Sequence, residues 1–243
     1  MAVLEIRHLT KSYGGEVKAV DDVSLTVDAG DIFAFIGPNG AGKTTTIKAV
    51  VGILDFNEGE IFIDGRSVRN EPVACKEVTA YIPDNPDLYD TLKGIDYLNF
   101  ICDLFEVPAK LREDRIARYA NAMELSKYLG DPISSYSHGM KQKLAVISAL
   151  VHAPKLMVLD EPFVGLDPRA SFQLKQFMHE LTQSGSAIFY STHVLEVAEK
   201  LCDKVAIIQD GRIVESGTME EVRGNKSLES VFMELTEDTG NEA

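Results

Sequence analysis

Long hydrophobic runs, paired cysteines and an excess of positive charge are all absent from this sequence of 243 residues. No run approaches the roughly 18 apolar residues that a membrane-spanning helix needs, and residues 1–15 lack an apolar core of signal-peptide length. We therefore expect a soluble, intracellular chain. Cys75, Cys102 and Cys202 are far apart in the sequence, so neither a disulfide nor a metal site is predicted for them, only ordinary semi-buried thiols.

Basic residues are also scarce, because 24 Lys and Arg stand against 38 Asp and Glu, which gives a formal net charge of −14. Such a charge repels the phosphates of DNA and RNA, so no nucleic-acid partner is predicted. A nucleotide is a polyanion as well, and a site for one has to be positive locally. The hydrophobic content of 45% is ordinary for a packed globular protein of one large or two small domains.

A glycine-rich segment, Gly37-Pro38-Asn39-Gly40-Ala41-Gly42-Lys43-Thr44, has the glycine, lysine and hydroxyl spacing of a phosphate-binding P-loop. The apolar run at residues 32–36 predicts a buried strand before it, and helical spacing follows it. The glycines let backbone N–H groups approach a phosphate chain closely. Lys43 supplies a point charge for the β- and γ-phosphates, Thr44 a hydroxyl for Mg²⁺, and Thr45 a hydrogen bond for the α-phosphate. The segment therefore predicts ATP and Mg²⁺ as ligands, with a plain glycine turn as the alternative.

The pattern along the chain predicts a single α/β domain. Residues 1–87 read mostly as strands and include an N-terminal antiparallel β subdomain. Residues 88–151 have helical spacing and form an inserted α-helical subdomain. Strands and helices alternate over residues 152–224, which complete a P-loop NTPase core around a mainly parallel sheet. Residues 225–243 predict a C-terminal amphipathic helix and an acidic tail that frays.

Two Asp-Gly pairs predict tight hairpin turns. Asp64-Gly65 follows the apolar residues 61–63, and Asp210-Gly211 separates a strand at residues 205–209 from residues 212–215. Each pair is expected to reverse the chain between two antiparallel strands.

An apolar strand at residues 156–159 ends in two adjacent carboxylates, Asp160 and Glu161. In α/β sheets, ligands bind at the carboxyl ends of the strands, so both side chains are expected beside a nucleotide. Asp160 can hold Mg²⁺ through a water, while Glu161 can polarise a water for in-line attack on the γ-phosphate. The alternative is a strand that simply runs into an acidic turn.

The order of these motifs resembles the ABC ATPase family, the nucleotide-binding subunits that power membrane transporters. The resemblance spans nearly the whole chain. Its features, in chain order, are Tyr13, the P-loop, the segment from Tyr81 to Asp84, Ser137-His138-Gly139-Met140, the strand ending in Asp160 and Glu161, Gly165-Leu166-Asp167, and Ser191-Thr192-His193.

The resemblance implies an active site shared between two subunits. In that family the signature, here Ser137, His138, Gly139 and Met140, lies at a helix N-terminus and binds the γ-phosphate of ATP held by a second copy. Two subunits, in a homodimer or a heterodimer, then pack head to tail around two MgATP. A helix N-terminus capped by Ser137 attracts an anion, which is compatible with this role. Without the family, the same residues are a capped loop to which no ligand is assigned.

Three further roles follow from the resemblance, each with a plainer alternative. His193 contacts the γ-phosphate and positions the attacking water, and it follows a strand at residues 188–191. The alternative is that a lone histidine at a strand end is an ordinary surface or core residue. Asp167 belongs to a loop that crosses the dimer interface, or merely forms a turn before Pro168. Tyr13 stacks on adenine, or only fills the small sheet.

The sequence departs from the family pattern at two places. Asp84 stands where the family usually has a glutamine that touches Mg²⁺, and its charge should make ATP binding depend more strongly on the metal. His138 and Met140 replace a glycine and a glutamine of the usual signature, and His138 would bring a titratable ring near the other subunit's nucleotide. This bulkier signature resembles the branch that serves antibiotic, lipid or small-molecule exporters.

The leading hypothesis is thus an ATP hydrolase that drives a membrane-spanning permease. The permease is expected to be an exporter and to hold the subunit at the cytoplasmic face of the cell membrane. Leu88, Tyr89 and Tyr97 are candidates for docking, although apolar residues there can also be internal packing. A soluble ABC-type switch in DNA repair or translation is the alternative, disfavoured by the acidic charge, the single ATPase unit and the lack of a coiled-coil arm. A small-molecule kinase would leave the signature and His193 unexplained.

Overall fold

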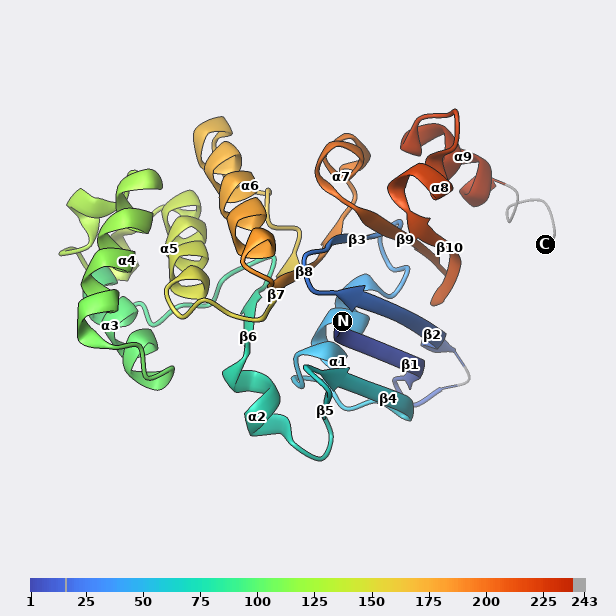
Figure 1. The fold of residues 1–243 in the computed structure, drawn as a ribbon, viewed down its shortest axis with the longest axis horizontal. Helices are drawn as coiled ribbons and strands as arrows, with labels where there is room; N and C mark the ends of the chain where they lie inside the picture. Colours follow the sequence, from blue (N-terminus) through green and yellow to red (C-terminus); the bar gives the residue numbers. More distant parts are fainter. Residues whose placement is uncertain (16, 238–243) are drawn as a thin grey trace.

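The computed structural model describes residues 1–15 and 17–237, which fold into two β-sheets with helices around them (Figure 1). A four-stranded antiparallel sheet has the order β2 (Lys18–Asp28), β1 (Ala2–Ser12), β4 (Glu58–Ile63) and β5 (Arg66–Ser67). A six-stranded sheet has the order β10 (Arg212–Thr218), β9 (Lys204–Gln209), β3 (Ile32–Ile36), β8 (Ala187–Thr192), β7 (Leu156–Asp160) and β6 (Thr79–Ile82). In the larger sheet the pairs are parallel except for β9 with β10. The predicted fold class, a mainly parallel core beside an antiparallel subdomain, is confirmed.

Helices α3, α4 and α5 form a group at one end of the molecule, away from the antiparallel sheet, whereas α7, α8 and α9 lie toward the other end (Figure 1). In chain order the helices are α1 (Lys43–Val50), α2 (Pro72–Glu77), α3 (Gly94–Leu104), α4 (Ala109–Ala122), α5 (His138–Leu150), α6 (Pro168–Gln183), α7 (Leu195–Leu201), α8 (Met219–Arg223) and α9 (Leu228–Glu237). Two short 3₁₀ turns, Ser126–Tyr128 and Ile133–Ser135, connect α4 to α5.

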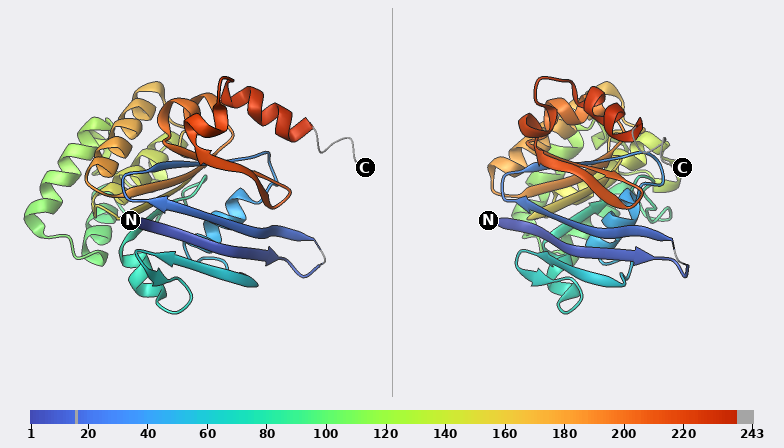
Figure 2. Two further views of the ribbon diagram at one scale, coloured as in Figure 1. Left: turned by 45° about the vertical axis from the view of Figure 1, so that its right-hand side comes forward. Right: turned by 90° about the vertical axis from the view of Figure 1, so that its right-hand side faces the viewer.

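The central strand β3 explains how the core divides. All five of its residues are buried, and successive side chains of a strand point to opposite faces of the sheet. Ile32, Ala34 and Ile36 pack with helices α3 to α7 on one face. Phe33 and Phe35 pack with α1 and the antiparallel sheet on the other face, so α1 lies between the two sheets (Figure 2). A strand covered on both faces reads as a continuous apolar run, which is the pattern that predicted it.

Both predicted hairpin turns are confirmed. Asp64 and Gly65 have φ values of 51° and 76° between β4 and β5, and Asp210 and Gly211 have φ values of 48° and 79° between β9 and β10. Positive φ at both central residues is the type I′ geometry that Asp-Gly pairs favour.

The predictions for residues 1–87, for the cysteines and for the C-terminal segment have different outcomes. Helix α2 lies within the segment that read mostly as strands, and its six residues are too few for a periodic signal. All three cysteines are free and buried. The C-terminal helix is present as α9, whereas the acidic tail from residue 238 lies outside the described residues. The division of the chain near residues 87, 151 and 224 stays a prediction.

Candidate nucleotide-binding site

The glycine-rich loop joins β3 to α1, in the strand and helix context that the sequence predicted. Gly37 lies so close to β9 that a Cβ there would be 2.3 Å from the Ile208 carbonyl oxygen. Gly42 has a φ of 106°, and a Cβ on it would be 2.4 Å from the carbonyl oxygen of Ala19. A side chain at either position would push the loop away from its neighbouring strands. These two glycines therefore fix where the loop lies.

The Lys43 ammonium lies inside this loop. The Nζ atom donates to the carbonyl oxygens of Gly37 at 2.7 Å and Pro38 at 3.1 Å, and the residue is 7% exposed. Burial lowers the pKa of Lys43, while the negative charges of Glu161 and Asp160 act in the opposite direction. The loop thus holds a desolvated cation close to two carboxylates.

A hollow of about 240 Å³ opens beside the loop. It brings together the P-loop, the end of β7 and the segment after β6. The end of β7 was expected there from its place at a strand end, and Asp84 from the family resemblance. The lining residues are Ala19, Asn39, Gly40, Gly42, Lys43, Thr44, Thr45, Asp84, Asp160 and Glu161.

The two carboxylates at the end of β7 have different environments. Asp160 is 3% exposed and accepts a hydrogen bond from the Ser191 hydroxyl, because β7 and β8 pair these residues in register. Glu161 has a φ of 49°, a left-handed conformation that is strained for a residue with a side chain. Its backbone N–H donates to the Ser191 carbonyl oxygen at 3.2 Å. The turn after Asp160 therefore redirects the Glu161 carboxylate into the hollow.

His193 lies just past the end of β8 and faces the same carboxylate. Its Nδ1 atom is 2.9 Å from Glu161 Oε1, and the two side chains are 57% and 14% exposed. The ring is therefore neither a core residue nor an isolated surface residue, since Glu161 fixes its orientation.

The side chains present fit a magnesium ion that arrives with a nucleotide. Thr44, Asp84 and Asp160 all line the hollow, whereas the described residues contain no group of three or more His, Cys, Asp or Glu that could hold a metal by itself. Mg²⁺ is typically bound by one or two carboxylates together with substrate phosphates, and keeps several waters. Burial, with the charges of Asp160 and Asp84, raises the pKa of Tyr81 to about 12, so its phenol stays neutral beside these carboxylates.

The signature residues lie at the start of α5, where Ser137 is the N-cap and its Oγ accepts from Met140 N at 3.3 Å. His138 and Gly139 pack on Gly165, because a Cβ on Gly165 would be 2.7 Å from the His138 ring and one on Gly139 would be 2.9 Å from the Gly165 oxygen. Of the described residues that line the P-loop hollow, none belongs to the signature. Met140 instead lines a separate hollow of about 660 Å³.

Asp167 caps α6, accepting from Ala170 N at 2.9 Å, and pairs with Lys143 of α5 at 2.6 Å. The Lys143 ammonium lowers the pKa of Asp167. Asp167 therefore does more than begin a turn before Pro168, since it joins α6 to the signature helix. Its place at a dimer interface stays a prediction.

Tyr13 does not fill the small sheet, so that alternative is wrong. The ring is 64% exposed, its hydroxyl lies 3.4 Å from Thr45 Oγ1, and the Lys11 ammonium is 5.2 Å from the ring centre. The exposed ring therefore stands beside the P-loop helix, where a base could reach it.

Comparison with known proteins gives the family. The model of the ABC transporter family matches residues 20–164. The ATP-binding protein EcsA of the ABC-type transporters, from Bacillus subtilis, is 34% identical over the whole of both chains. The linearmycin resistance ATP-binding protein LnrL of the same organism is 30% identical, over 99% of this chain and 77% of its own length. The chain belongs to the ABC transporter family as one of its ATP-binding subunits, and is an ABC-type ATPase.

Solved structures agree with this fold. A structure described as the ATP-binding subunit of an ABC transporter superposes with a TM-score of 0.93 at 34% identity, over 96% of this chain and 99% of its own. A dimeric, post-hydrolysis ATP-binding cassette with ADP and Pi superposes with a TM-score of 0.81 at 20% identity, over 89% and 98% of the two chains. In the described part of the chain, none of the helices combines the length and the hydrophobicity that a bilayer span requires.

Proposed function

We propose that this chain hydrolyses ATP at a site completed by a second ATPase subunit, and that it thereby drives a membrane-spanning permease. One observation carries the proposal. The P-loop and the carboxylates share a hollow, while the capped helix end of the signature lies outside it. A phosphate-binding helix end that is separate from its own chain's P-loop is suited to the nucleotide of another subunit.

Five of the side chains that line the hollow have defined roles in this proposal. Lys43 leaves the Gly37 and Pro38 carbonyls to bind the β- and γ-phosphates, with the loop N–H groups around them. Thr44, Asp84 and Asp160 hold the Mg²⁺, which neutralises phosphate charge when it is bound. Glu161 accepts the proton of a water whose oxygen attacks the γ-phosphorus, and the bond to the β-phosphate oxygen breaks to leave ADP.

His193 and Tyr13 complete the cis half of the site. The imidazole, oriented by Glu161, contacts the γ-phosphate and fixes the attacking water, since positioning a water lowers the entropic part of the barrier. The exposed Tyr13 ring stacks on adenine. Together they place the nucleotide between the antiparallel sheet and the end of β8.

Ser137, His138, Gly139 and Met140 supply the trans half, whether the second subunit is identical or different. The Ser137 cap and the first N–H groups of α5 bind the other subunit's γ-phosphate. The dimeric cassette described with ADP and Pi supports this arrangement. The head-to-tail pairing also places the loop of Asp167, which packs on the signature through Gly165, at the interface.

The permease docks on an exposed aromatic cluster formed by Tyr89 and by Phe100 of α3. Tyr89 and Phe100 are 59% and 44% exposed, and their rings meet edge to face at 5.9 Å. The ring of Tyr97 packs against Tyr89 and is only 9% exposed, so Tyr97 is part of the internal packing and not of the docking surface. Leu88 is half-buried. Asp90, beside Tyr89, pairs with Lys141 of the signature helix at 2.7 Å. Docking is therefore linked to the trans site.

The direction of transport and the location follow from the same proposal. The resistance function in the name of LnrL supports export of a small molecule. Bound to a permease, the subunit is peripheral, at the cytoplasmic face of the membrane.

Mixing two inactive variants tests the composite site. Lys43→Ala disables the P-loop half and Ser137→Arg disables the signature half, so each homodimer lacks ATPase activity. A mixed dimer contains one site with an intact Lys43 and an intact Ser137, and activity should appear on mixing. A mixture no more active than its parents would contradict a composite site between two copies of this chain. Ser134→Arg, an exposed serine outside the signature, is the control for Ser137→Arg.

A further inference from the structure

The turn between β9 and β10 touches both the P-loop and β2. The Gly211 N–H donates to the Ala41 carbonyl oxygen at 3.1 Å, and the Asp21 N–H donates to the Gly211 carbonyl oxygen at 2.8 Å. A Cβ on Gly211 would lie 3.1 Å from the Ala19 oxygen, so the turn is closely packed there. A displacement of this turn would therefore move both the P-loop and β2.

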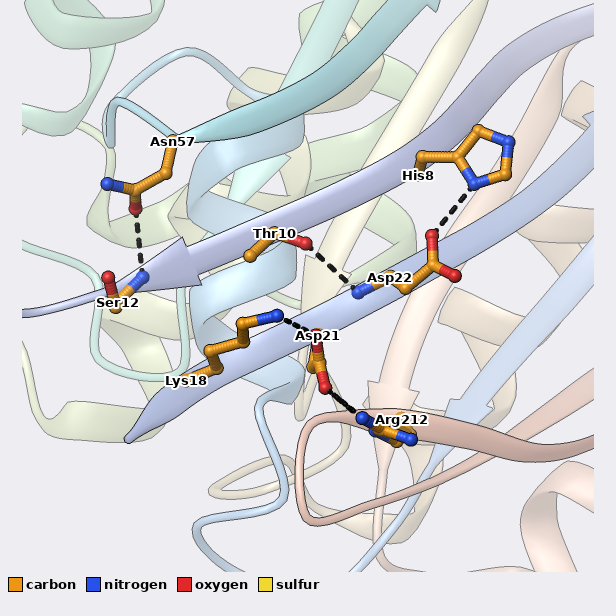
Figure 3. Close-up of polar contacts among 8 residues, drawn as sticks. All are labelled: His8, Thr10, Ser12, Lys18, Asp21, Asp22, Asn57 and Arg212. Carbon is orange, nitrogen blue, oxygen red and sulfur yellow. Dashed lines mark hydrogen bonds and ion pairs between the residues drawn. The ribbon is translucent and has the colours of Figure 1, made fainter. Parts of the chain in front are cut away.

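The Asp21 carboxylate connects this turn to the end of the β1–β2 hairpin. Arg212 Nε donates to Asp21 Oδ2 at 2.8 Å, and Lys18 Nζ donates to Asp21 Oδ1 at 2.5 Å (Figure 3). The Asp21 side chain is 12% exposed, whereas those of Arg212 and Lys18 are 71% and 46% exposed. Both cations lower the pKa of Asp21, so the carboxylate stays ionised between them.

The hairpin end that these contacts hold is the one that carries Tyr13. Lys18 pairs with Ser12 in the β1–β2 register, and Ser12 directly precedes Tyr13. On the other strand, the Ser12 N–H donates to Asn57 Oδ1 at 2.9 Å (Figure 3). The hairpin is thus held on both strands at the point where Tyr13 leaves it.

Side-chain contacts are needed to position this end of the hairpin because the hydrogen-bond ladder between β1 and β2 is irregular. The β1–β2 register shifts next to Lys11, on both sides, and Asp22 has a φ of 56°. Bulges of this kind interrupt ladder hydrogen bonds and twist the strands. Where the pairing of β1 with β2 is interrupted in this way, other contacts are needed to fix the end of the hairpin that carries Tyr13.

We propose that Asp21 is a positioning residue for the base of the nucleotide: through Arg212 and Lys18 it fixes the Tyr13 end of the hairpin relative to the P-loop. Base and phosphates are then bound at a set separation, which favours a purine nucleoside triphosphate over a bare polyphosphate. This inference rests on the proposed stacking of Tyr13 on adenine.

Asp22 provides a matched control one position away. Its carboxylate faces His8, with Nδ1 and Oδ1 2.8 Å apart, and these side chains are 79% and 68% exposed (Figure 3). Asp21→Asn and Asp22→Asn each remove one negative charge from the same strand. Only the first removes the partner of Arg212 and Lys18.

A single tryptophan reports on the Tyr13 position, because the chain has no tryptophan of its own. In the Tyr13→Trp protein, MgATP should change the emission, whereas magnesium tripolyphosphate, which lacks a base, should change it far less. Adding Asp21→Asn should shrink the response and weaken MgATP binding by about threefold to tenfold, a part of what base stacking is worth. Tripolyphosphate affinity by calorimetry should stay within about twofold, and Asp22→Asn should behave as the parent.

Substitutions of Arg212, the exposed partner, test the same interaction with Asp21. Arg212→Gln should reproduce the part of the Asp21→Asn effect that the Arg212 contact carries. The double variant should lose no more than Asp21→Asn alone, because that variant already removes this contact. Arg212→Lys, which keeps the charge, should restore most of the response. Arg212 is on the surface, so this series remains informative if Asp21→Asn folds poorly.

Several results would overturn the inference. Unchanged MgATP affinity and emission in both Asp21→Asn and Arg212→Gln would do so, as would an equal loss of MgATP and tripolyphosphate binding. If MgATP does not change the emission of the Tyr13→Trp protein while calorimetry still shows MgATP binding, the inference is wrong but the ATPase function stands. If calorimetry shows no MgATP binding in the unmodified chain, the proposed function itself is wrong.

Discussion

His193 and Glu161, from the ends of two neighbouring parallel strands, face each other with Nδ1 2.9 Å from Oε1. The carboxylate is the less exposed partner, and its backbone is held in a left-handed conformation by the turn after β7. Strain of this kind persists only where the surrounding structure enforces it. The pair is therefore a preformed unit, in which one side chain orients the other beside the P-loop.

Replacing Glu161 by glutamine should separate binding from hydrolysis. The amide keeps the size of the side chain and a hydrogen bond to His193 but cannot accept the proton of the attacking water. We expect turnover to fall by about 10²- to 10⁴-fold, the usual contribution of a general base, with MgATP affinity unchanged. Phosphate release and calorimetry measure the two quantities. Glu196→Gln, a surface carboxylate paired with Lys200, is the control, and near-normal turnover in Glu161→Gln would remove it from the base role.

Lys43→Ala should act on binding itself. A hydrogen bond to a charged group contributes about 1.5–3 kcal/mol, so the MgATP dissociation constant should rise by about tenfold to a hundredfold. Lys48→Ala, an exposed lysine on the same helix, should leave it unchanged.

The same lysine gives a pH dependence. Burial lowers the pKa of Lys43 below its ordinary 10.5, so the ammonium is lost at a lower pH than in an exposed lysine. MgATP affinity in the free subunit should therefore decline as the pH rises through this lowered value. Calorimetry across alkaline pH tests it, and an affinity that stays constant to the pH where exposed lysines titrate would argue against the buried environment.

Asp167→Ala should lower the stability of the fold by about 1 kcal/mol, the usual effect of losing an N-cap. Because the folded pKa lies below 3.8, the stabilisation by the ionised carboxylate is complete above that value and is lost as the pH falls through the folded pKa. The difference between the unmodified chain and Asp167→Ala in urea unfolding should therefore shrink in acid. Asp167→Asn keeps a capping side chain but loses the charge that Lys143 pairs with, so it should lie between the two. A difference that stays constant or grows in acid would contradict this assignment.

Removing magnesium tests Asp84. Beside Asp160 and Glu161 in the hollow, a third carboxylate repels the phosphates when no metal is present. ATP affinity with a chelator should therefore fall further in the unmodified chain than in Asp84→Gln, while MgATP affinity is similar in both. Equal losses on chelation would show that Asp84 does not face the phosphates.

The sequence predicts what local chemistry determines. The P-loop between β3 and α1, the Asp64-Gly65 and Asp210-Gly211 turns, and the gathering of Asp160 and Glu161 at a strand end are confirmed, because each follows from residue type and short-range spacing. The ABC family assignment is confirmed as well.

What long-range packing determines could not be predicted in the same way. The Ser191 hydroxyl reaches Asp160 only because β7 and β8 pair in one register, and Lys143 reaches Asp167 only because α5 and α6 are neighbours. Tyr89 and Tyr97 have the same side chain at nearby positions, yet one is exposed and the other buried. Pairing and burial of this kind depend on residues far away in the chain.

Sedimentation velocity of the Glu161→Gln protein, with and without saturating MgATP, tests most sharply whether two subunits share each nucleotide. Without nucleotide we expect monomers. With MgATP, binding continues but hydrolysis is nearly stopped, so a stable dimer should accumulate, and Ser137→Arg added to the same protein should abolish it. Monomers in the Glu161→Gln protein, at MgATP concentrations that calorimetry shows to be saturating, would contradict a site shared by two copies of this chain.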